Sequence, residues 1–152
     1  MAVRPSRPAT ARACALDLLA RREHSTAELR AKLASREFDA EEIDSTLARL
    51  SAEGLVSDER FVEAFVSAHR RRGQGPHRIR AELRQKGVAT ELAEQHLAAS
   101  VTDWTELARQ VRVRRFGATP PRDFRERAKQ ARFLQMRGFS ADAIHGALKG
   151  DE

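Results

Sequence analysis

The chain has 152 residues, of which 41% are hydrophobic and only 5% aromatic, and none is tyrosine. This length corresponds to one domain or one array of small repeats, and the scarcity of aromatic residues argues against a β-sandwich, in which they are enriched. An excess of 28 basic over 22 acidic residues gives a formal net charge of +6, which favours an anionic partner such as nucleic acid or an acidic protein surface.

No segment has the composition of a membrane span or a secretion signal. No stretch approaches the ~20 consecutive apolar residues that a span requires, and the first ten residues carry Arg4 and Arg7 without a following apolar run. We therefore expect a cytoplasmic protein with no membrane contact. The single cysteine, Cys14, permits no internal disulfide, and its apolar neighbours predict a buried thiol.

Glycines and N-cap residues divide the chain into nine short predicted helices. Ser25 to Glu28 and Asp39 to Glu42 have the spacing of capping boxes, and Gly87, Gly117 and Gly138 each follow a helical segment. No segment has a convincing strand pattern. The predicted helices occupy about residues 10–22, 25–35, 39–53, 57–72, 76–86, 90–100, 103–116, 121–137 and 140–149.

These helices repeat as three similar units. Leu33, Leu83 and Leu134 correspond at offsets of 50 and 51 residues, and Gly87 and Gly138 correspond in the turn that follows. We therefore predict an all-α fold of three tandem three-helix repeats forming an elongated, curved body. The predicted boundaries are a flexible tail at 1–9 and repeats at 10–55, 56–101 and 102–150.

The first repeat departs from this pattern in one turn. Where the second and third repeats have glycine, the first has Glu37. A left-handed backbone costs an ordinary residue about 1–2 kcal/mol. We therefore expect this turn to close differently.

The sequence contains no pattern typical of a catalytic or cofactor site. It has no Walker loop and no G-x-G-x-x-G motif for nucleotide phosphates, and none of its five histidines stands at zinc-ligand spacing from a Cys or carboxylate. Ser25, Ser57 and Ser140 stand where helices begin, which favours capping over nucleophilic catalysis. We expect no catalytic residue, no metal, no cofactor and no enzymatic activity.

Positive charge increases along the chain. Residues 1–57 hold 9 basic and 9 acidic residues, 58–100 hold 8 and 6, and 101–152 hold 11 and 7. Clusters in the second and third repeats predict an anion-binding surface, although a solvated helix face paired locally with Glu82 and Glu126 is an equal alternative. The candidate contact residues are Arg70, Arg71, Arg72, Arg78, Arg80, Arg84, Lys86, Arg122, Arg125, Lys129 and Arg132.

The cations of the last repeat follow the spacing of a single helical stripe. Arg122, Arg125, Lys129 and Arg132 are predicted to lie opposite a face that contains Phe124. Aromatic residues are not interleaved with these cations. We therefore do not expect single-strand recognition by stacked bases.

Several long strings resemble the RecX family, the bacterial regulators of the RecA recombinase, in the same order along the chain. The resemblance covers nearly everything after about Ala11. Glu37 departs from the glycine expected there. The strings are Arg21 to Ser25, Ala27 to Arg30, Gly54 to Phe61, Gly75 to Val88, Arg115 to Gly117, Lys129 to Leu134 and Arg137 to Ser140.

The resemblance implies a negative regulator with the same three-repeat fold. Such a protein binds the RecA–DNA filament and inhibits filament growth, ATP hydrolysis, strand exchange and co-protease activity, thereby modulating DNA repair and the SOS response. The expected partners are the RecA filament and DNA, touched directly or through the filament, and we expect a monomer. We hypothesise that the basic faces contact DNA or acidic RecA loops, and that the first repeat contacts protein through Glu41, Glu42 and Asp44.

Two other interpretations stay open at this point. One is a stand-alone basic helical DNA-binding module in which residues 78–86 act as a recognition helix. The other is a structural scaffold with a basic surface. Binding to a RecA filament compared with the same naked DNA separates all three.

Overall fold

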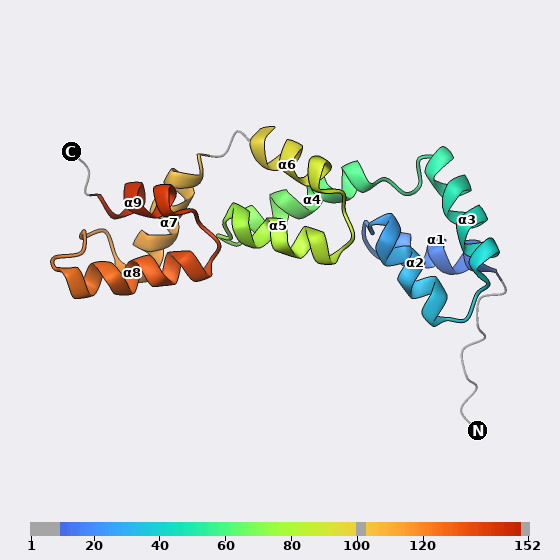
Figure 1. The fold of residues 1–152 in the computed structure, drawn as a ribbon, viewed down its shortest axis with the longest axis horizontal. Coiled ribbons are helices and arrows are strands. Elements are labelled where there is room, and N and C mark those ends of the chain that lie inside the picture. Colours follow the sequence, from blue (N-terminus) through green and yellow to red (C-terminus); the bar gives the residue numbers. More distant parts are fainter. Residues whose placement is uncertain (1–9, 100–102, 150–152) are drawn as a thin grey trace, which may run out of the picture. The chain divides into compact units, whose positions relative to one another are not determined.

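The computed structural model describes residues 10–99 and 103–149 of the chain. Within these residues the chain forms nine α-helices and no strand (Figure 1), as predicted. The predicted tail at 1–9, the predicted end of the sixth helix at Ser100 and residues 150–152 lie outside the described residues. The helices are α1 (Ala11–Arg21), α2 (Thr26–Ser35), α3 (Ala40–Ala52), α4 (Asp58–Arg71), α5 (Pro76–Gln85), α6 (Thr90–Ala99), α7 (Trp104–Phe116), α8 (Phe124–Met136) and α9 (Ala141–Leu148).

The largest difference from the predicted boundaries is at the start of α8. The helix begins at Phe124, because the Asp123 side chain caps it by accepting a hydrogen bond from the Glu126 backbone N–H at 2.9 Å. Pro120 and Pro121 precede this cap without helical structure. Arg122 therefore lies before the helix, and its predicted place on the helical stripe is wrong.

The chain folds into two compact units. The first comprises the residues up to Ala64 together with Lys86–Val88, and the second comprises Phe65–Gln85 and the residues from Ala89 onward. In the first unit α1, α2 and α3 contact one another. Their apolar faces form one core, which contains the buried residues Cys14, Leu18, Leu29, Leu33, Ile43, Leu47, Leu50 and Val56.

The second unit contains the end of α4, from Phe65 onward, and helices α5 to α9. Here α5 contacts α6, while α7, α8 and α9 contact one another. Leu134 and Phe139 are buried in the core of these last three helices, and Trp104 packs against it partly buried. Ala108, Ala143 and Ala147 of α7 and α9 are also buried in this core.

The two predicted capping boxes differ in the structure. Ser25 Oγ accepts from the backbone N–H of Glu28 at 3.1 Å, so it caps α2 as predicted. Asp39 precedes α3 but its side chain makes no capping hydrogen bond. Instead Glu42 Oε1 accepts from the backbone N–H of Ala11 at 3.1 Å, and thereby satisfies a donor at the start of α1.

At two corresponding junctions, the start of the second helix of one repeat contacts the end of the second helix of the next repeat. In the first unit, Ser25 Oγ donates to the carbonyl of Lys86 at 2.7 Å. In the second unit, the backbone N–H of Gly75 donates to the carbonyl of Arg137 at 2.8 Å, and that of His77 to the carbonyl of Gly138 at 2.9 Å. Carbonyls left over at one helix end are thus satisfied at the start of another.

These junctions explain two of the glycines. Gly87 has φ +74°, and a Cβ there would lie 2.4 Å from the Cβ of Ala27. Gly138 has φ +97°, and a Cβ there would lie 2.5 Å from the Cβ of Arg78. Glycine is therefore required at both positions for two reasons, the left-handed backbone and the close approach of the neighbouring side chain.

The corresponding turn of the first repeat closes in the same way as the others, contrary to expectation. Glu37 has φ +66°, and its backbone N–H donates to Ala34 O at 3.0 Å, as Gly138 N–H donates to Gln135 O at 3.0 Å. Glu37 is exposed. An ordinary residue is tolerated here at the expense of backbone strain.

Candidate interaction surface

The predicted contact residues are distributed over α4, α5 and α8, and their environments differ. At the end of α4, Arg71 and Arg72 are exposed, whereas Arg70 is half-buried. The carbonyl of Arg72 accepts from Nη1 of Arg137 at 3.4 Å. This group therefore contributes two accessible guanidinium groups at the last turn of a helix.

The cations of α5 are largely occupied by acidic side chains. Arg78 Nε pairs with Glu82 Oε1 at 3.2 Å along the helix. Arg80 is half-buried and pairs with Glu94 of α6, its Nη2 lying 3.3 Å from Oε2. Arg84 is exposed and Lys86 half-buried. Of the two arginines predicted to share a face of α5, only Arg84 is therefore free to bind a partner, because Arg80 is paired with Glu94 of the neighbouring helix.

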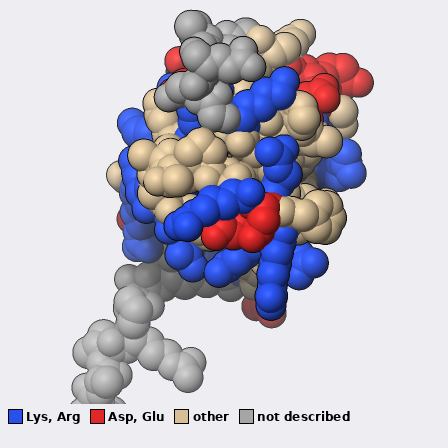
Figure 2. Space-filling view, turned by 90° about the vertical axis from the view of Figure 1, so that its left-hand side faces the viewer, with Lys and Arg blue, Asp and Glu red and all other residues tan. Residues whose placement is uncertain are grey.

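The cations of α8 are free of such partners. Arg125, Lys129 and Arg132 are exposed, and within the described part of the chain none of them forms an ion pair. They line a shallow hollow of about 350 Å³ together with Phe124 and Ala128. In Figure 2, which views the chain from the side of α7–α9, Lys and Arg side chains far outnumber acidic ones.

Phe124 does not lie where the sequence analysis placed it. Its side chain is 84% exposed and lines the same hollow as the three cations. The face of α8 that packs into the protein is instead formed around the buried Gln130 and Leu134. The aromatic residue expected opposite the stripe therefore lies beside it.

A second hollow, of about 360 Å³, lies in the second unit where α4 ends beside α7. It brings Arg70 and Arg71 together with Arg114, which the sequence analysis did not single out. Asp103 and Glu106 line the same hollow. The acidic groups offset the positive charge, so this hollow is a weaker anion site than the outer face of α8.

One arginine in the most basic repeat is structural. Arg112 is 3% exposed, and its Nε donates to the carbonyl of Ala147 at 3.0 Å. Its Nη1 lies 3.4 Å from the carbonyls of Gly117 and Thr119. A buried guanidinium needs such acceptors, so Arg112 ties the ends of α7 and α9 together and adds nothing to the surface charge.

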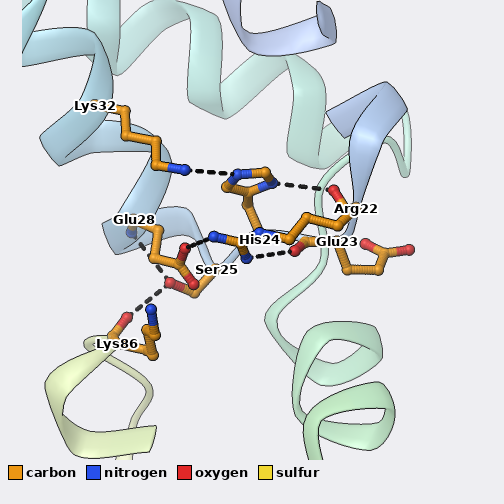
Figure 3. A network of polar contacts seen from close by, with 7 residues as sticks. All are labelled: Arg22, Glu23, His24, Ser25, Glu28, Lys32 and Lys86. Atoms are coloured by element: carbon orange, nitrogen blue, oxygen red, sulfur yellow. Dashed lines mark hydrogen bonds and ion pairs between the residues drawn. The ribbon is translucent and has the colours of Figure 1, made fainter. Parts of the chain in front are cut away.

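The first unit contains a polar network beside the junction between Ser25 and Lys86 (Figure 3). His24 is buried, with Nδ1 3.0 Å from the carbonyl of Arg22 and Nε2 3.0 Å from Nζ of Lys32. Because an ammonium group only donates, Nε2 accepts and Nδ1 carries the proton. Burial lowers the pKa of His24 below its ordinary value, and the charges of Arg22 and Lys32 lower it further.

Glu28 completes this network. Its Oε2 accepts from Nη2 of Arg22 at 2.8 Å. Burial acts to raise the pKa of Glu28, but the hydrogen bond and charge of Arg22, together with Lys86 and His24, outweigh it and hold the pKa below the usual value. Near pH 7 the Glu28 carboxylate is therefore charged and the His24 imidazole is neutral.

The acidic residues expected to make a protein contact in the first repeat are partly engaged. Glu42 caps α1, as described above, and Asp44 pairs with Arg30. Glu41 is exposed. Two of the three carboxylates thus have partners within the protein.

No group of three or more His, Cys, Asp or Glu side chains within the described residues is placed to hold a metal ion. None of the helices in the described ranges is long and apolar enough to cross a membrane.

Comparison with known proteins gives one consistent result. The family models for the first, second and third three-helix domains of RecX match residues 11–50, 57–97 and 102–148. The regulatory protein RecX of Halorhodospira halophila is 50% identical over 136 residues, which cover 90% of this chain and 84% of that protein. The regulatory protein RecX of Ectopseudomonas mendocina is 47% identical over 143 residues, which cover 94% and 95% of the two chains.

The fold also matches solved structures. The crystal structure of RecX from Lactobacillus salivarius superposes with a TM-score of 0.78 at 24% identity, covering 90% of this chain and 91% of that one. At this identity the similarity supports the all-α three-repeat fold alone. Together with the three matched domains and the closely related sequences, it leads to one conclusion: the chain belongs to the RecX family.

Proposed function

We propose that the chain is a negative regulator of RecA. It binds the RecA–DNA filament and inhibits filament growth, ATP hydrolysis, strand exchange and co-protease activity, and so modulates DNA repair and the SOS response. Membership of the RecX family, whose curated relatives are named regulatory proteins, carries this proposal. The chain acts as a monomer through binding alone and needs no catalytic residue.

The contact surface is formed by the exposed cations of the second unit. Arg125, Lys129 and Arg132 of α8 are its centre, because they are exposed and have no acidic partner among the described residues. Arg71, Arg72 and Arg84 are also exposed. Arg78 and Arg80 contribute less, because ion pairs already occupy them. Their common ligands are the phosphates of filament DNA or acidic side chains of RecA.

Charge reversal on α8 tests this proposal. We expect R125E/R132E to raise the concentration needed for half-inhibition of DNA-dependent RecA ATPase at least tenfold, and to reduce its dependence on salt, because fewer counterions are released on binding. The matched control is R21E/R49E, which changes the net charge equally at exposed positions of the first unit. We expect the control to stay within about twofold to threefold of the unmodified chain, since only non-local charge changes.

A binding comparison separates the proposed function from its rival. The unmodified chain is titrated against a RecA filament and against the same DNA without RecA at matched salt. A clear preference for the filament supports the regulator, whereas equal affinities support the stand-alone DNA-binding module. Full RecA ATPase at an excess of the chain would contradict the proposal.

A further inference from the structure

The outer face of α8 combines charge and exposed apolar surface in an unusual way. On a helix with 3.6 residues per turn, the face opposite the buried Gln130 and Leu134 carries cations and two large apolar side chains but no acidic residue. Phe124 is 84% exposed and Met136 74%, whereas the other large apolar side chains exposed in the described residues, Leu55 and Val113, are 42% and 38% exposed. The residues of this face are Phe124, Arg125, Ala128, Lys129, Arg132 and Met136.

The folding of the helix does not account for these residues. Arg125 lies in the first turn of α8, where the helix dipole opposes positive charge. Exposing the Phe124 ring to water forgoes about 1.5–3 kcal/mol that burial of such a side chain provides. Neither residue stabilises the fold, so the arrangement points to a ligand that covers the ring and neutralises the cations.

We propose that the outer face of α8 binds a single strand of nucleic acid, with one base stacked on the ring of Phe124 and the neighbouring phosphates held by Arg125, Lys129 and Arg132. The proposal rests on the proposed role of these cations in binding an anionic partner, of which it selects the phosphates of nucleic acid, but not on inhibition of RecA. It replaces the expectation from sequence that no aromatic residue lies among the cations.

The dimensions and chemistry of the face fit such a strand. Arg125 to Arg132 spans about 10 Å along the helix, so more than one phosphate of a single strand can lie along these cations. A nucleotide supplies both an aromatic face for Phe124 and an adjacent anion for an arginine fork. In a duplex the faces of the bases are covered by their neighbours, so only an unpaired strand can use the ring. An acidic protein surface would neutralise the cations, but its charge alone would leave the exposed ring of Phe124 uncovered.

The test uses the full chain and fluorescently labelled oligonucleotides without RecA. Fluorescence anisotropy gives the affinity for a single-stranded thymidine oligomer and for a duplex of the same length, over a range of salt concentrations. We expect F124A to weaken single-strand binding about five- to hundredfold, as loss of one stacked base does, and to change duplex binding less than twofold. F124W should retain the affinity, because its ring can stack. L55A, which removes an exposed apolar side chain outside this face, is the matched control and should change neither affinity.

The salt dependence separates the two kinds of contact. Replacing Arg125, Lys129 and Arg132 by alanine should lower the slope of log affinity against log salt by about 2, since each phosphate contact with a single strand contributes about 0.7. F124A should leave that slope unchanged, because stacking releases no counterion. Both variants should retain the circular dichroism spectrum and melting temperature of the unmodified chain.

Two outcomes would overturn the proposal. The first is unchanged single-strand affinity in F124A, and a loss of RecA filament binding in the same variant would then assign the ring to a protein contact. The second is an equal loss of single-strand and duplex affinity. These results are independent of the proposed function. A chain that binds the strand through Phe124 but leaves RecA ATPase intact would contradict only the regulatory role.

Discussion

The second helices of the second and third repeats, α5 and α8, differ in what holds their side chains. The start of α5 packs against the turn at Gly138 and donates backbone hydrogen bonds to it. Two arginines of α5, Arg78 and Arg80, are paired with glutamates. The start of α8 is capped only by its own Asp123, and its outer cations have no acidic partner among the described residues. Two helices with similar positive charge thus differ in role. The arginines of α5 are used in contacts within the protein, whereas the cations of α8 are exposed on the surface.

The comparison also explains why net charge alone is a poor guide to a binding face. The last third of the chain has four more basic than acidic residues, but Arg112 is buried among carbonyls. Only charges that are both exposed and unpaired attract a new partner, because an existing ion pair must otherwise be broken. This difference between α5 and α8 can be tested by variants of each.

The largest expected effect is on the junction at the start of α5. G138A places a Cβ 2.5 Å from the Cβ of Arg78 in a backbone of φ +97°, so strain and overpacking together should lower the free energy of unfolding by about 2–5 kcal/mol. Urea denaturation followed by circular dichroism measures the loss. Gly54 also has a positive φ, +74°, but a Cβ there meets nothing within 4 Å. G54A should therefore lose only about 1–2 kcal/mol, and equal losses in the two variants would contradict a tight junction.

A smaller effect is expected from the paired arginine of α5. R80A removes the contacts to Glu94 and His77 and should lower the free energy of unfolding by about 0.5–1 kcal/mol, the usual range for partly exposed pairs. R132A on α8 should change it by less than about 0.5 kcal/mol, because the side chain is exposed and unpaired. The same denaturation measurement compares them. A double-mutant cycle of R80A with E94A isolates the pair, and a coupling energy of zero would show that Arg80 is no more engaged than Arg132.

A gain in stability is expected at the exposed turn of the first repeat, where Glu37 lies. E37G relieves the left-handed strain of Glu37, at φ +66°, but makes the unfolded chain more flexible, so the net stabilisation should be about 0.5–1 kcal/mol. Thermal denaturation should show a raised melting temperature. E37A keeps the Cβ and removes the carboxylate. A gain in E37A as large as in E37G would assign the effect to the side chain and not to the backbone.

Much of the fold could be predicted from local patterns. Eight of the nine helices begin and end close to their predicted limits, because caps such as Ser25 and glycines such as Gly117 act within a few residues of where they stand in the sequence. The capping role of Asp39 and the helical position of Arg122 were predicted wrongly. Near Asp39, the expected partner Glu42 instead accepts from Ala11, which lies 31 residues away in the chain. At Arg122, the local cap formed by Asp123 sets the start of the helix.

The candidate surface was predicted less completely. The sequence indicated the three cations of α8 but not that Phe124 lies beside them. The face that α8 buries, around Gln130 and Leu134, is set by its packing against α7 and α9. The pairing of Arg80 with Glu94 joins residues 14 apart on different helices. Such contacts depend on how the helices pack, which spacing along one helix does not report.

The sequence by itself determined the all-α fold, the three similar units and the excess of basic residues, because helical periodicity, capping and charge are local properties. Only the tertiary structure decided which arginines are buried, which are paired and which are exposed, and why glycine is required at 87 and 138 but not at 37. The physical reason is that burial, ion pairing and close approach are set by neighbours that are distant in the chain, and these neighbours are defined only once the helices have packed.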